Sequence, residues 1–337
     1  MREHRPNRLL LTGAPGWLAD AFLQSLVRGA MPSVSAVRCL VHFSHDVGAA
    51  ARERWGLDAE IVRGDVTDPA SLDRAMVGVD TVLHAAGVIH VEHIEDYYTV
   101  NTCGTRSLAQ AAARAGVRRF VYVSSNAAGG RSPMPTRLLR EDDPNRPLSH
   151  YGRSKLLAER WLFDGEGSME RVVLRPCMFY GPPVPARHVD VYKRITGGWM
   201  PIIGNGHYAR SLVYIDNLLQ AVRLALTRPA PDKQVYYIAD RAAYTTRTVV
   251  EGMAKALGVE PRLVTLPAFV AELAWRADGL LAMGGGYHQT LHLVGEGNWN
   301  VGVSIEKARA DLGYDPEVDL DVGMRTAVAW CRERALL

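Results

Sequence analysis

Short apolar runs alternate with stretches of helical periodicity through the first half of the chain. Between the runs, apolar residues recur three and four positions apart, which predicts helices over residues 19–28, 71–76, 105–115 and 151–163. The apolar runs predict strands over residues 9–12, 37–42, 60–63, 81–85, 120–124 and 172–174. Alternating strands and helices form a parallel sheet with helices on both faces, and its buried strands read as continuous apolar runs. The pattern therefore predicts an α/β fold with a doubly wound parallel sheet.

The regular alternation ends near residue 175. Proline and glycine cluster over residues 181–185 and 197–206, which is typical of loops. Further on, the pattern predicts helices over residues 214–226 and 249–257, a strand over 235–239, and a buried or amphipathic helix over 263–283. The chain thus predicts a regular α/β unit followed by a smaller, less regular one.

Composition narrows the class of protein. The 337 residues include 39 Lys and Arg against 36 Asp and Glu, so the formal net charge is +3 and no nucleic-acid partner is expected. Apolar residues make up 47% and charged residues 22%, which is typical of a folded enzyme. Because no apolar run is long enough to cross a bilayer, no membrane partner is expected. The four widely spaced cysteines form no metal or disulfide pattern, which favours the reducing cytoplasm.

A glycine turn, T-G-A-P-G-W-L-A over residues 12–19, joins the first strand to the first helix. Gly13 allows a tight turn, Gly16 allows the main chain to approach a pyrophosphate, and an alanine replaces the third glycine. The N–H groups of the helix N-terminus attract phosphate. A purely structural turn is the alternative. We expect a dinucleotide at Gly13, Pro15, Gly16, Trp17 and Leu18.

The ends of the next two strands bear on the form of the cofactor. Asp65 is expected to accept a hydrogen bond from an adenine amino group, while Asp68 caps the helix that follows. After the second strand there is neither an acid placed to hold an NAD ribose nor an arginine for an NADP phosphate. His42 and its polar neighbours either touch a 2′-phosphate or cover the adenine. The sequence leaves NAD and NADP open.

A Tyr-x-x-x-Lys pair, Tyr151 and Lys155, opens a predicted helix. Residues four apart lie on one helix face, so the Lys155 ammonium is expected to lower the pKa of the Tyr151 phenol towards neutrality. Such a phenol can give a proton to a ketone, or take one from an alcohol, as hydride moves. Ser124 and Ser125 end an earlier strand and are placed to polarise the same oxygen. An unremarkable surface pair is the alternative.

In this order the motifs resemble the extended short-chain dehydrogenase/reductase family, which includes nucleotide-sugar epimerases, dehydratases and 3β-hydroxysteroid-dehydrogenase-like enzymes. The resemblance covers nearly the whole chain. Its other motifs are H-A-A-G at 84–87, Asn101 with the Gly-Thr pair that follows it, R-P at 175–176, Y-G-P at 180–182 and R-S-L-V-Y-I-D-N-L at 210–218. It implies a Rossmann-type NAD(P)-binding domain over residues 1–175. It also implies a mainly substrate-binding domain over 176–337, with elements near 210–240 returning to the sheet.

The resemblance also implies roles for single residues. Tyr151 would be the catalytic acid/base, Lys155 would tune it and hold the nicotinamide ribose, and Ser125 rather than Ser124 would bind the substrate oxygen. Asn101 would support the active-site helix. Arg210 would grip a diphosphate, or else form a salt bridge to Asp216 or another carboxylate. The further residues implied at the cofactor are Val66, His84, Ala85, Ala86, Pro176 and Cys177, and Asn126 is implied at the substrate.

Departures from the family's motifs bear on the reaction. Asn126 and Ala127 replace an Asp-Glu pair, which disfavours 4,6-dehydration. Met178 replaces an asparagine that often meets the diphosphate, and a thioether cannot donate to phosphate, whereas Arg210 favours a nucleotide sugar. We expect an NAD(P)-dependent epimerase that acts on a nucleotide sugar through a transient keto intermediate. The alternatives are an NAD(P)H-dependent dehydrogenase or ketoreductase acting on a steroid-like or other bulky alcohol or ketone, and a non-enzymatic cofactor-sensing scaffold.

Three further expectations concern assembly, metals and the C-terminal part. The resemblance implies a homodimer that pairs through helices 105–115 and 151–163. His90 and His93 lack a third ligand, so no metal is expected. Tyr287, His288 and His292 follow three glycines and belong either to a substrate lid or to a surface loop.

Overall fold

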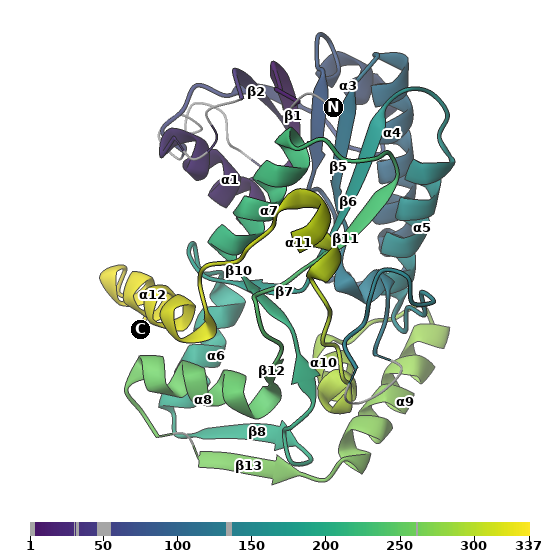
Figure 1. The fold of residues 1–337 in the computed structure, drawn as a ribbon. Coiled ribbons are helices and arrows are strands. Elements are labelled where there is room, and N and C mark those ends of the chain that lie inside the picture. Colours follow the sequence, from purple (N-terminus) through teal and green to yellow (C-terminus); the bar gives the residue numbers. More distant parts are fainter. Residues whose placement is uncertain (1–3, 30, 32–33, 46–54, 133–136, 261) are drawn as a thin grey trace.

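A computed structural model describes residues 4–29, 31, 34–45, 55–132, 137–260 and 262–337. Its centre is a seven-stranded parallel sheet of strand order β11-β6-β5-β4-β1-β2-β3 (Figure 1). The strands are β1 (Arg8–Ala14), β2 (Ala36–Val41), β3 (Glu60–Arg63), β4 (Thr81–His84), β5 (Arg119–Val123), β6 (Glu170–Pro176) and β11 (Gln234–Ile238). Each contains or overlaps the strand predicted there, and the α/β fold with a doubly wound parallel sheet is confirmed.

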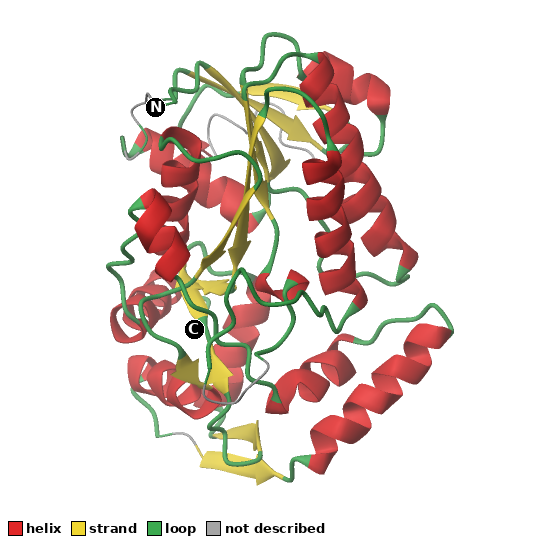
Figure 2. Ribbon diagram, turned by 45° about the vertical axis from the view of Figure 1, so that its right-hand side comes forward, coloured by secondary structure: helices red, strands yellow, loops and turns green. Residues whose placement is uncertain are grey.

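Helices cover both faces of this sheet (Figure 2). One face bears α1 (Trp17–Val27), α7 (Ile215–Thr227) and α11 (Glu306–Leu312), and the other bears α3 (Pro69–Ala75), α4 (Thr105–Arg114) and α5 (His150–Asp164). Neighbouring residues of β1 pack on opposite faces: Leu9 and Leu11 join the first core cluster and Leu10 joins the second. The strands are continuous apolar runs because both of their faces are buried.

The strand order reverses between β1 and β4. These strands pair in register, and Thr12 lies opposite His84. The turn after β1 and the segment after β4 therefore leave the sheet side by side. In open α/β sheets, a crevice forms at such a switch point, outside the carboxyl ends of the strands.

The remaining elements form a second layer below the sheet in Figure 1. Here α6 (Ala186–Thr196), α8 (Thr246–Leu257) and α12 (Leu320–Glu333) share a third core cluster. Short strand pairs join β7 (Met178–Tyr180) to β10 (Leu212–Tyr214), β9 (Ala209–Arg210) to β12 (Tyr244–Thr245), and β8 (Trp199–Ile203) to β13 (Arg262–Leu266). Two more helices, α9 (Phe269–Met283) and α10 (Gln289–Gly295), lie beside the carboxyl edge of the sheet.

Two predictions in this part of the chain are wrong. The loop predicted over residues 197–206 contains β8, and the helix predicted over 263–283 begins with β13. These strands pair with each other in parallel, so a partner more than fifty residues away decides their structure. Pro267 then separates β13 from α9, because proline cannot continue a strand ladder.

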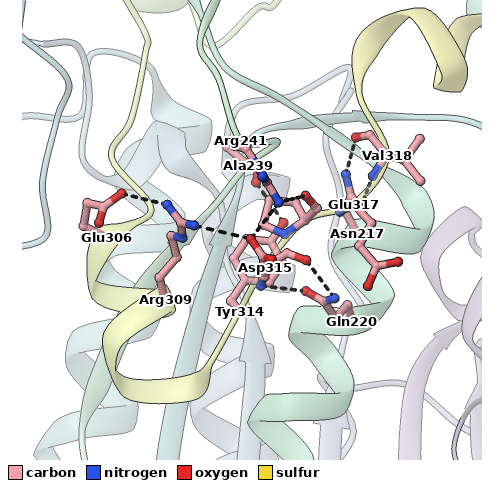
Figure 3. Close-up of polar contacts among 11 residues, drawn as sticks. Asn217, Gln220, Ala239, Arg241, Glu306, Arg309, Tyr314, Asp315, Glu317 and Val318 are labelled. Atoms are coloured by element: carbon pink, nitrogen blue, oxygen red, sulfur yellow. Dashed lines mark hydrogen bonds and ion pairs between the residues drawn. The ribbon is translucent and has the colours of Figure 1, made fainter.

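Hydrogen bonds connect the segment before α12 to α7 and to the residue that follows β11 (Figure 3). The Asn217 side chain accepts hydrogen bonds from the main-chain N–H groups of Glu317 and Val318, both at 3.1 Å. Tyr314 donates its hydroxyl to the carbonyl oxygen of Ala239 just beyond β11, at 2.8 Å. These bonds fix the segment that leads into α12. Among the described residues, no helix combines the length and apolarity needed to cross a bilayer.

Candidate active site

The glycine turn lies at the switch point and touches the segment after β4. Gly13 has φ +94°, and a Cβ on it would lie 2.7 Å from the main chain of Ala85 and Ala86. Gly16 is the N-cap of α1 and offers no side chain to the N–H groups of the first turn. A Cβ there would meet the Gly13 carbonyl oxygen at 2.6 Å. This bare, close-packed cradle of N–H groups fits the pyrophosphate of a dinucleotide.

His84 lies below the crevice surface. Its ring is fully buried between two threonine hydroxyls, with Nδ1 2.7 Å from Thr12 Oγ1 and Nε2 2.8 Å from Thr105 Oγ1. Burial, helped by the charge of Lys155, lowers the pKa of His84 to about 3, so the ring is neutral. Its side chain therefore joins β1, β4 and α4. The partly exposed Ala85 and Ala86, which follow it, line the crevice.

The predicted adenine end brings Asp65 and His42 together. His42 Nε2 lies 3.1 Å from Asp65 Oδ2, and its Nδ1 lies 2.7 Å from Ser44 Oγ. Asp65 Oδ1 accepts a hydrogen bond from the main-chain N–H of Thr67 at 2.8 Å. Asp68 caps α3 through the N–H groups of its first turn, as the sequence predicts. The imidazole–carboxylate pair links the ends of β2 and β3 where a ribose would lie.

Tyr151 and Lys155 lie in the first two turns of α5, whose N-cap Ser149 accepts a hydrogen bond from Gly152 N at 3.1 Å. The buried Lys155 ammonium donates to the carbonyl oxygen of Val123 at 3.2 Å, and it lies 5.0 Å from the centre of the Tyr122 ring. Burial lowers the pKa of Lys155 to about 8, although the charge of Glu159 opposes this shift. The amine is thus fixed at the carboxyl end of β5.

The prediction that Lys155 lowers the pKa of Tyr151 towards neutrality is wrong for the protein alone. Burial raises the pKa of the Tyr151 phenol to about 12, and only a hydrogen bond with Ser125 opposes that shift. The Lys155 ammonium makes its hydrogen bond to Val123 instead. Removal of the phenol from water therefore dominates its pKa, and Tyr151 holds its proton at neutral pH.

Two consecutive serines follow β5 and have different partners. Ser125 interacts with Tyr151 and accepts a hydrogen bond from Ala127 N at 3.2 Å. Ser124 instead donates to the carboxylate of Glu159. This arrangement favours Ser125 over Ser124 as the hydroxyl beside the tyrosine.

The sequence analysis missed the buried ion pair beneath this site. Glu159 accepts two hydrogen bonds from Arg175, at 3.0 Å from Nε and 2.6 Å from Nη2, and both side chains are buried. Arg175 also donates to Asn145 at 2.7 Å and to the Tyr237 hydroxyl at 3.1 Å. Glu159 follows Lys155 by one helical turn, so the i+4 spacing is the signal that could have revealed it.

Asn101 lies in a π-helical segment, η1 (Tyr97–Gly104), that precedes α4. Its side chain accepts from Val88 N at 2.8 Å and donates to Ser154 Oγ at 3.1 Å. It therefore joins the segment after β4 to α5 between Tyr151 and Lys155. This contact agrees with the supporting role that the resemblance implies.

A cavity of about 380 Å³ opens beside Tyr151. One wall is formed by η1 and the start of α5, and the other by α9, α10 and the loop between them. Most of its lining is apolar: Ile94, Leu148, Trp275, Ala282 and Met283. Its polar and tyrosine lining residues are Tyr97, Ser149, His150, Tyr151, Arg153, Asp278, Tyr287 and His292. Of the three C-terminal residues singled out from the sequence, Tyr287 and His292 line this cavity, whereas the exposed His288 caps α10.

Arg210 is far in sequence from Tyr151 and Lys155, and elements of the C-terminal part hold its side chain. It donates from Nη2 to the carbonyl oxygen of Glu296 at 2.6 Å and from Nε to Thr246 Oγ1 at 3.4 Å. Asp216, the carboxylate considered as its partner, pairs with Arg28 at 3.7 Å instead. The guanidinium is partly buried, and burial lowers its pKa.

The other predicted contacts lie around the end of β6. Pro176 is its last residue, and the buried Cys177 donates its main-chain N–H to Ile238 at 3.0 Å. Met178 is 55% exposed, and Asn126 begins a short 3₁₀ turn after Ser125. In the described part of the chain, no cluster of three or more His, Cys, Asp or Glu side chains is arranged to hold a metal ion.

Comparisons with known proteins agree with this geometry. A model of the NAD dependent epimerase/dehydratase family matches residues 9–239. The chain is 35% identical to the uncharacterized protein y4nL of Sinorhizobium fredii, with 96% of this chain and 94% of that protein covered. It is 27% identical to a UDP-glucose 4-epimerase of Vibrio cholerae, with 95% and 94% covered.

A reductase and a solved structure are also similar. The chain is 27% identical to 4-hydroxy-2-methyl-3-oxo-4-farnesyl-3,4-dihydroquinoline-1-oxide ketoreductase of Stigmatella aurantiaca, with 94% of each chain covered. The structure of UDP-glucuronic acid 4-epimerase from Bacillus cereus in complex with UDP-glucuronic acid and NAD superposes with a TM-score of 0.76. It covers 97% of this chain and 99% of that one at 21% identity, so this likeness concerns the fold.

Proposed function

Because the chain belongs to the NAD dependent epimerase/dehydratase family, we propose that it interconverts an alcohol and a ketone on a bulky, largely apolar substrate. The observation that carries this proposal is the cavity with Tyr151 in its wall, whose other lining is mostly apolar. Such a cavity best suits a reductase or a dehydrogenase. Of the described residues that line it, Arg153 is the one arginine or lysine that could bind a phosphate.

The nicotinamide dinucleotide is assigned to the crevice between β1 and β4. The pyrophosphate would lie on the N–H groups of the glycine turn, from Gly13 to Leu18. Asp65 and His42 would hold the adenosine end, and Lys155 would hold the nicotinamide ribose. When bound, the cofactor accepts or supplies the hydride. Because neighbouring structures bind NAD but His42 also suits a phosphate, the NAD or NADP form is left to experiment.

Tyr151 is assigned as the proton donor and acceptor. Its phenol is protonated at neutral pH and touches Ser125, so both hydroxyls can hydrogen-bond to one substrate oxygen. In the reducing direction, the phenol gives its proton to the oxygen as that oxygen gains negative charge. Lys155 stabilises the resulting phenolate by its charge, and Glu159 helps to keep the buried Lys155 protonated. In the oxidising direction the same proton moves back.

A nucleotide-sugar epimerase is the second candidate. Arg210, in its R-S-L-V-Y-I-D-N-L motif, and the similarity to a UDP-glucose 4-epimerase favour it. However, the Arg210 guanidinium already donates to Glu296 and Thr246, and Met178 offers no donor to a diphosphate. Epimerisation returns the hydride to the same molecule, so it needs a retained cofactor and no net oxidant.

One set of measurements separates the candidates. The purified protein is denatured and any released dinucleotide is identified by mass. The protein is then tested for NADH and NADPH consumption with alkyl and polycyclic ketones, and for interconversion of UDP-glucose and UDP-galactose. Consumption of free reduced cofactor with apolar ketones supports the reductase. Retained NAD with sugar interconversion would establish the epimerase instead.

The variant Tyr151→Phe tests whether the fold is catalytic at all. We expect it to lose roughly 10²–10⁴-fold in kcat, because the proton donor is removed and little else changes. Tyr192→Phe is the matched control, since this buried tyrosine lies in the third core cluster and its hydroxyl donates to Met324 Sδ at the long distance of 3.9 Å. Equal rates in wild type and Tyr151→Phe would overturn the enzymatic proposal and favour a cofactor-sensing scaffold.

A further inference from the structure

The wall of the cavity that faces Tyr151 contains a carboxylate and an imidazole, and Arg153 lies on the opposite wall. The first of these walls is built by three elements: α9 supplies Asp278, α10 supplies His292, and the turn after α10 supplies Glu296. His292 Nδ1 lies 2.9 Å from Asp278 Oδ2, and His292 Nε2 lies 3.3 Å from Glu296 Oε1. Asp278 is only 8% exposed. The three side chains form one hydrogen-bonded group, which we call the acidic wall.

His292 in the acidic wall is held in its positively charged form at neutral pH. Burial alone would lower the pKa of His292, but the hydrogen bonds and charges of Glu296 and Asp278 outweigh it and raise the pKa to about 9. The imidazolium therefore lies between two carboxylate side chains, and Glu296 also interacts with the charge of Arg210. A carboxylate removed from water is costly unless it meets a donor or a cation.

One carboxylate oxygen of the wall remains available. Asp278 Oδ2 faces His292, whereas Asp278 Oδ1 has no hydrogen-bond donor among the described residues. Asp278 and His292 both line the cavity that contains Tyr151. A ligand that fills the cavity therefore meets the Tyr151 side chain at one wall and the Asp278 side chain at the other.

The other groups around this wall do not supply that donor. The Tyr97 hydroxyl donates to the carbonyl oxygen of Ile89 at 2.7 Å, and Tyr287 is engaged with Tyr97. His150 Nδ1 is hydrogen-bonded to the Tyr98 hydroxyl at 2.8 Å, and the His90 ring is hydrogen-bonded to the side chain of Gln289. The exposed Arg153 belongs to the cavity lining on the opposite wall.

We propose that Asp278 forms a polar subsite that binds a hydrogen-bond-donating hydroxyl or amino group of the substrate, remote from the carbonyl that reacts at Tyr151. This inference rests on the proposed function and adds the substrate class: an apolar body with a ketone at one end and a donor at the other. The same wall repels carboxylates and phosphates.

The test uses methyl ketones of eight, ten and twelve carbons whose far end is methyl, hydroxyl, amino or carboxylate. The kcat/KM for each is measured by consumption of NADH or NADPH. For wild type at pH 7, we expect hydroxyl and amino ends to exceed the methyl end of the same length about tenfold, with carboxylate lowest; a tenfold ratio corresponds to about 1.4 kcal/mol. Equal values across the four ends, or a preference for carboxylate, would overturn the proposal.

Two variants locate the effect on the wall. Asp278→Asn removes the charge at constant size and is expected to abolish the preference for the amino end. His292→Gln removes the positive charge and leaves both carboxylates, so the amino preference should rise. Glu272→Gln is the matched control, since this carboxylate is on α9 as well but lies at the surface, 55% exposed, beside Arg276. A change in selectivity with Glu272→Gln, or none with the two wall variants, would refute the assignment.

A binding measurement tests the Asp278 subsite independently of the proposed reaction. The same ketones are titrated against the wild type and the two wall variants, and quenching of tryptophan fluorescence is recorded, because Trp275 lines the cavity. If no ketone is reduced but the hydroxyl and amino ends still bind best in wild type, the reaction is wrong and the subsite stands. If no ketone binds, or binding ignores Asp278, the subsite is wrong whatever the reaction.

Discussion

Ser124 and Ser125 are adjacent in sequence, yet their hydroxyls serve different groups. Ser125 touches the Tyr151 phenol, and Ser124 donates to the buried Glu159. We expect Ser125→Ala to lower kcat/KM about 10²-fold, because a donor to the reacting oxygen is lost. Ser124→Ala is the matched control, and it should cost about 1 kcal/mol of unfolding free energy with a smaller change in kcat/KM. Steady-state kinetics and urea unfolding of both variants check this, and a larger kinetic loss in Ser124→Ala would reverse the assignment.

His84 makes the protein sensitive to acid. Its pKa is about 3 in the folded chain and 6.5 ordinarily, so between these values the unfolded chain binds a proton that the folded chain does not. Stability therefore rises with pH in this window and is lost as the pH falls. His4 and His188, whose pKa values are each lowered to about 4, act in the same direction.

The variant His84→Gln isolates this contribution. An amide can bridge the two threonine hydroxyls but does not titrate, so the unfolding free energy should fall less steeply below pH 6.5 than in wild type. Urea unfolding from pH 4 to 7 measures the slope. An unchanged slope would show that His84 does not contribute.

At the scale of elements, the glycine turn depends on close approach as well as on backbone conformation. Gly13→Ala places a Cβ 2.7 Å from the Ala85 and Ala86 main chain, so the turn and the segment after β4 must separate. We expect loss of dinucleotide binding, measured by calorimetry, together with a lower melting temperature. Gly29→Ala is the matched control: its φ of +75° is similarly unfavourable, but nothing lies within 4 Å of its Cβ position. Equal dinucleotide binding by Gly13→Ala and wild type would contradict the assignment of the glycine turn as the pyrophosphate site.

The acidic wall also joins α9 to α10, and it predicts sensitivity to alkali. The pKa of His292 is raised to about 9, so its contribution to stability is full below its ordinary value of 6.5 and disappears as the pH rises through 9. Between these values the folded chain binds the extra proton. We expect the unfolding free energy to fall with a slope near one proton, and His292→Gln to remove that slope. Guanidine unfolding from pH 6 to 10 measures both.

At the scale of the whole molecule, the proposed homodimer has a specific test. Trp161 on α5 is 42% exposed, and the Arg106 guanidinium of α4 lies 4.0 Å from the centre of its ring. If α4 and α5 pair with a second copy, Trp161→Glu should place a charge in the interface and yield a monomer by analytical ultracentrifugation. Val322→Glu on α12, 44% exposed in wild type, is the matched control and should leave the mass unchanged. A monomeric wild type would remove the dimer.

Much of the sheet could be predicted because its information is local. Strands such as β1 and β5 are apolar on both faces, and the glycine turn and Tyr151–Lys155 spacing each lie within a few residues. The pairing of β8 with β13 could not be predicted, because neither segment has a strong pattern and each becomes a strand only against the other. The division of the chain at residue 175 remains a prediction, and β11 crosses it by pairing with β6.

The sequence by itself determined the fold class, the place of the glycine turn and the identity of the tyrosine–lysine pair, because periodicity and spacing express them directly. Only the tertiary structure decided that Glu159 and Arg175 lie buried beneath Lys155, and that Asp278 and His292 line a cavity beside Tyr151. It also reversed the expected pKa shift of Tyr151. The reason is physical: hydrogen-bond partners and desolvation depend on groups that the fold brings together from distant positions, and a phenol's pKa follows its surroundings rather than its neighbours in sequence.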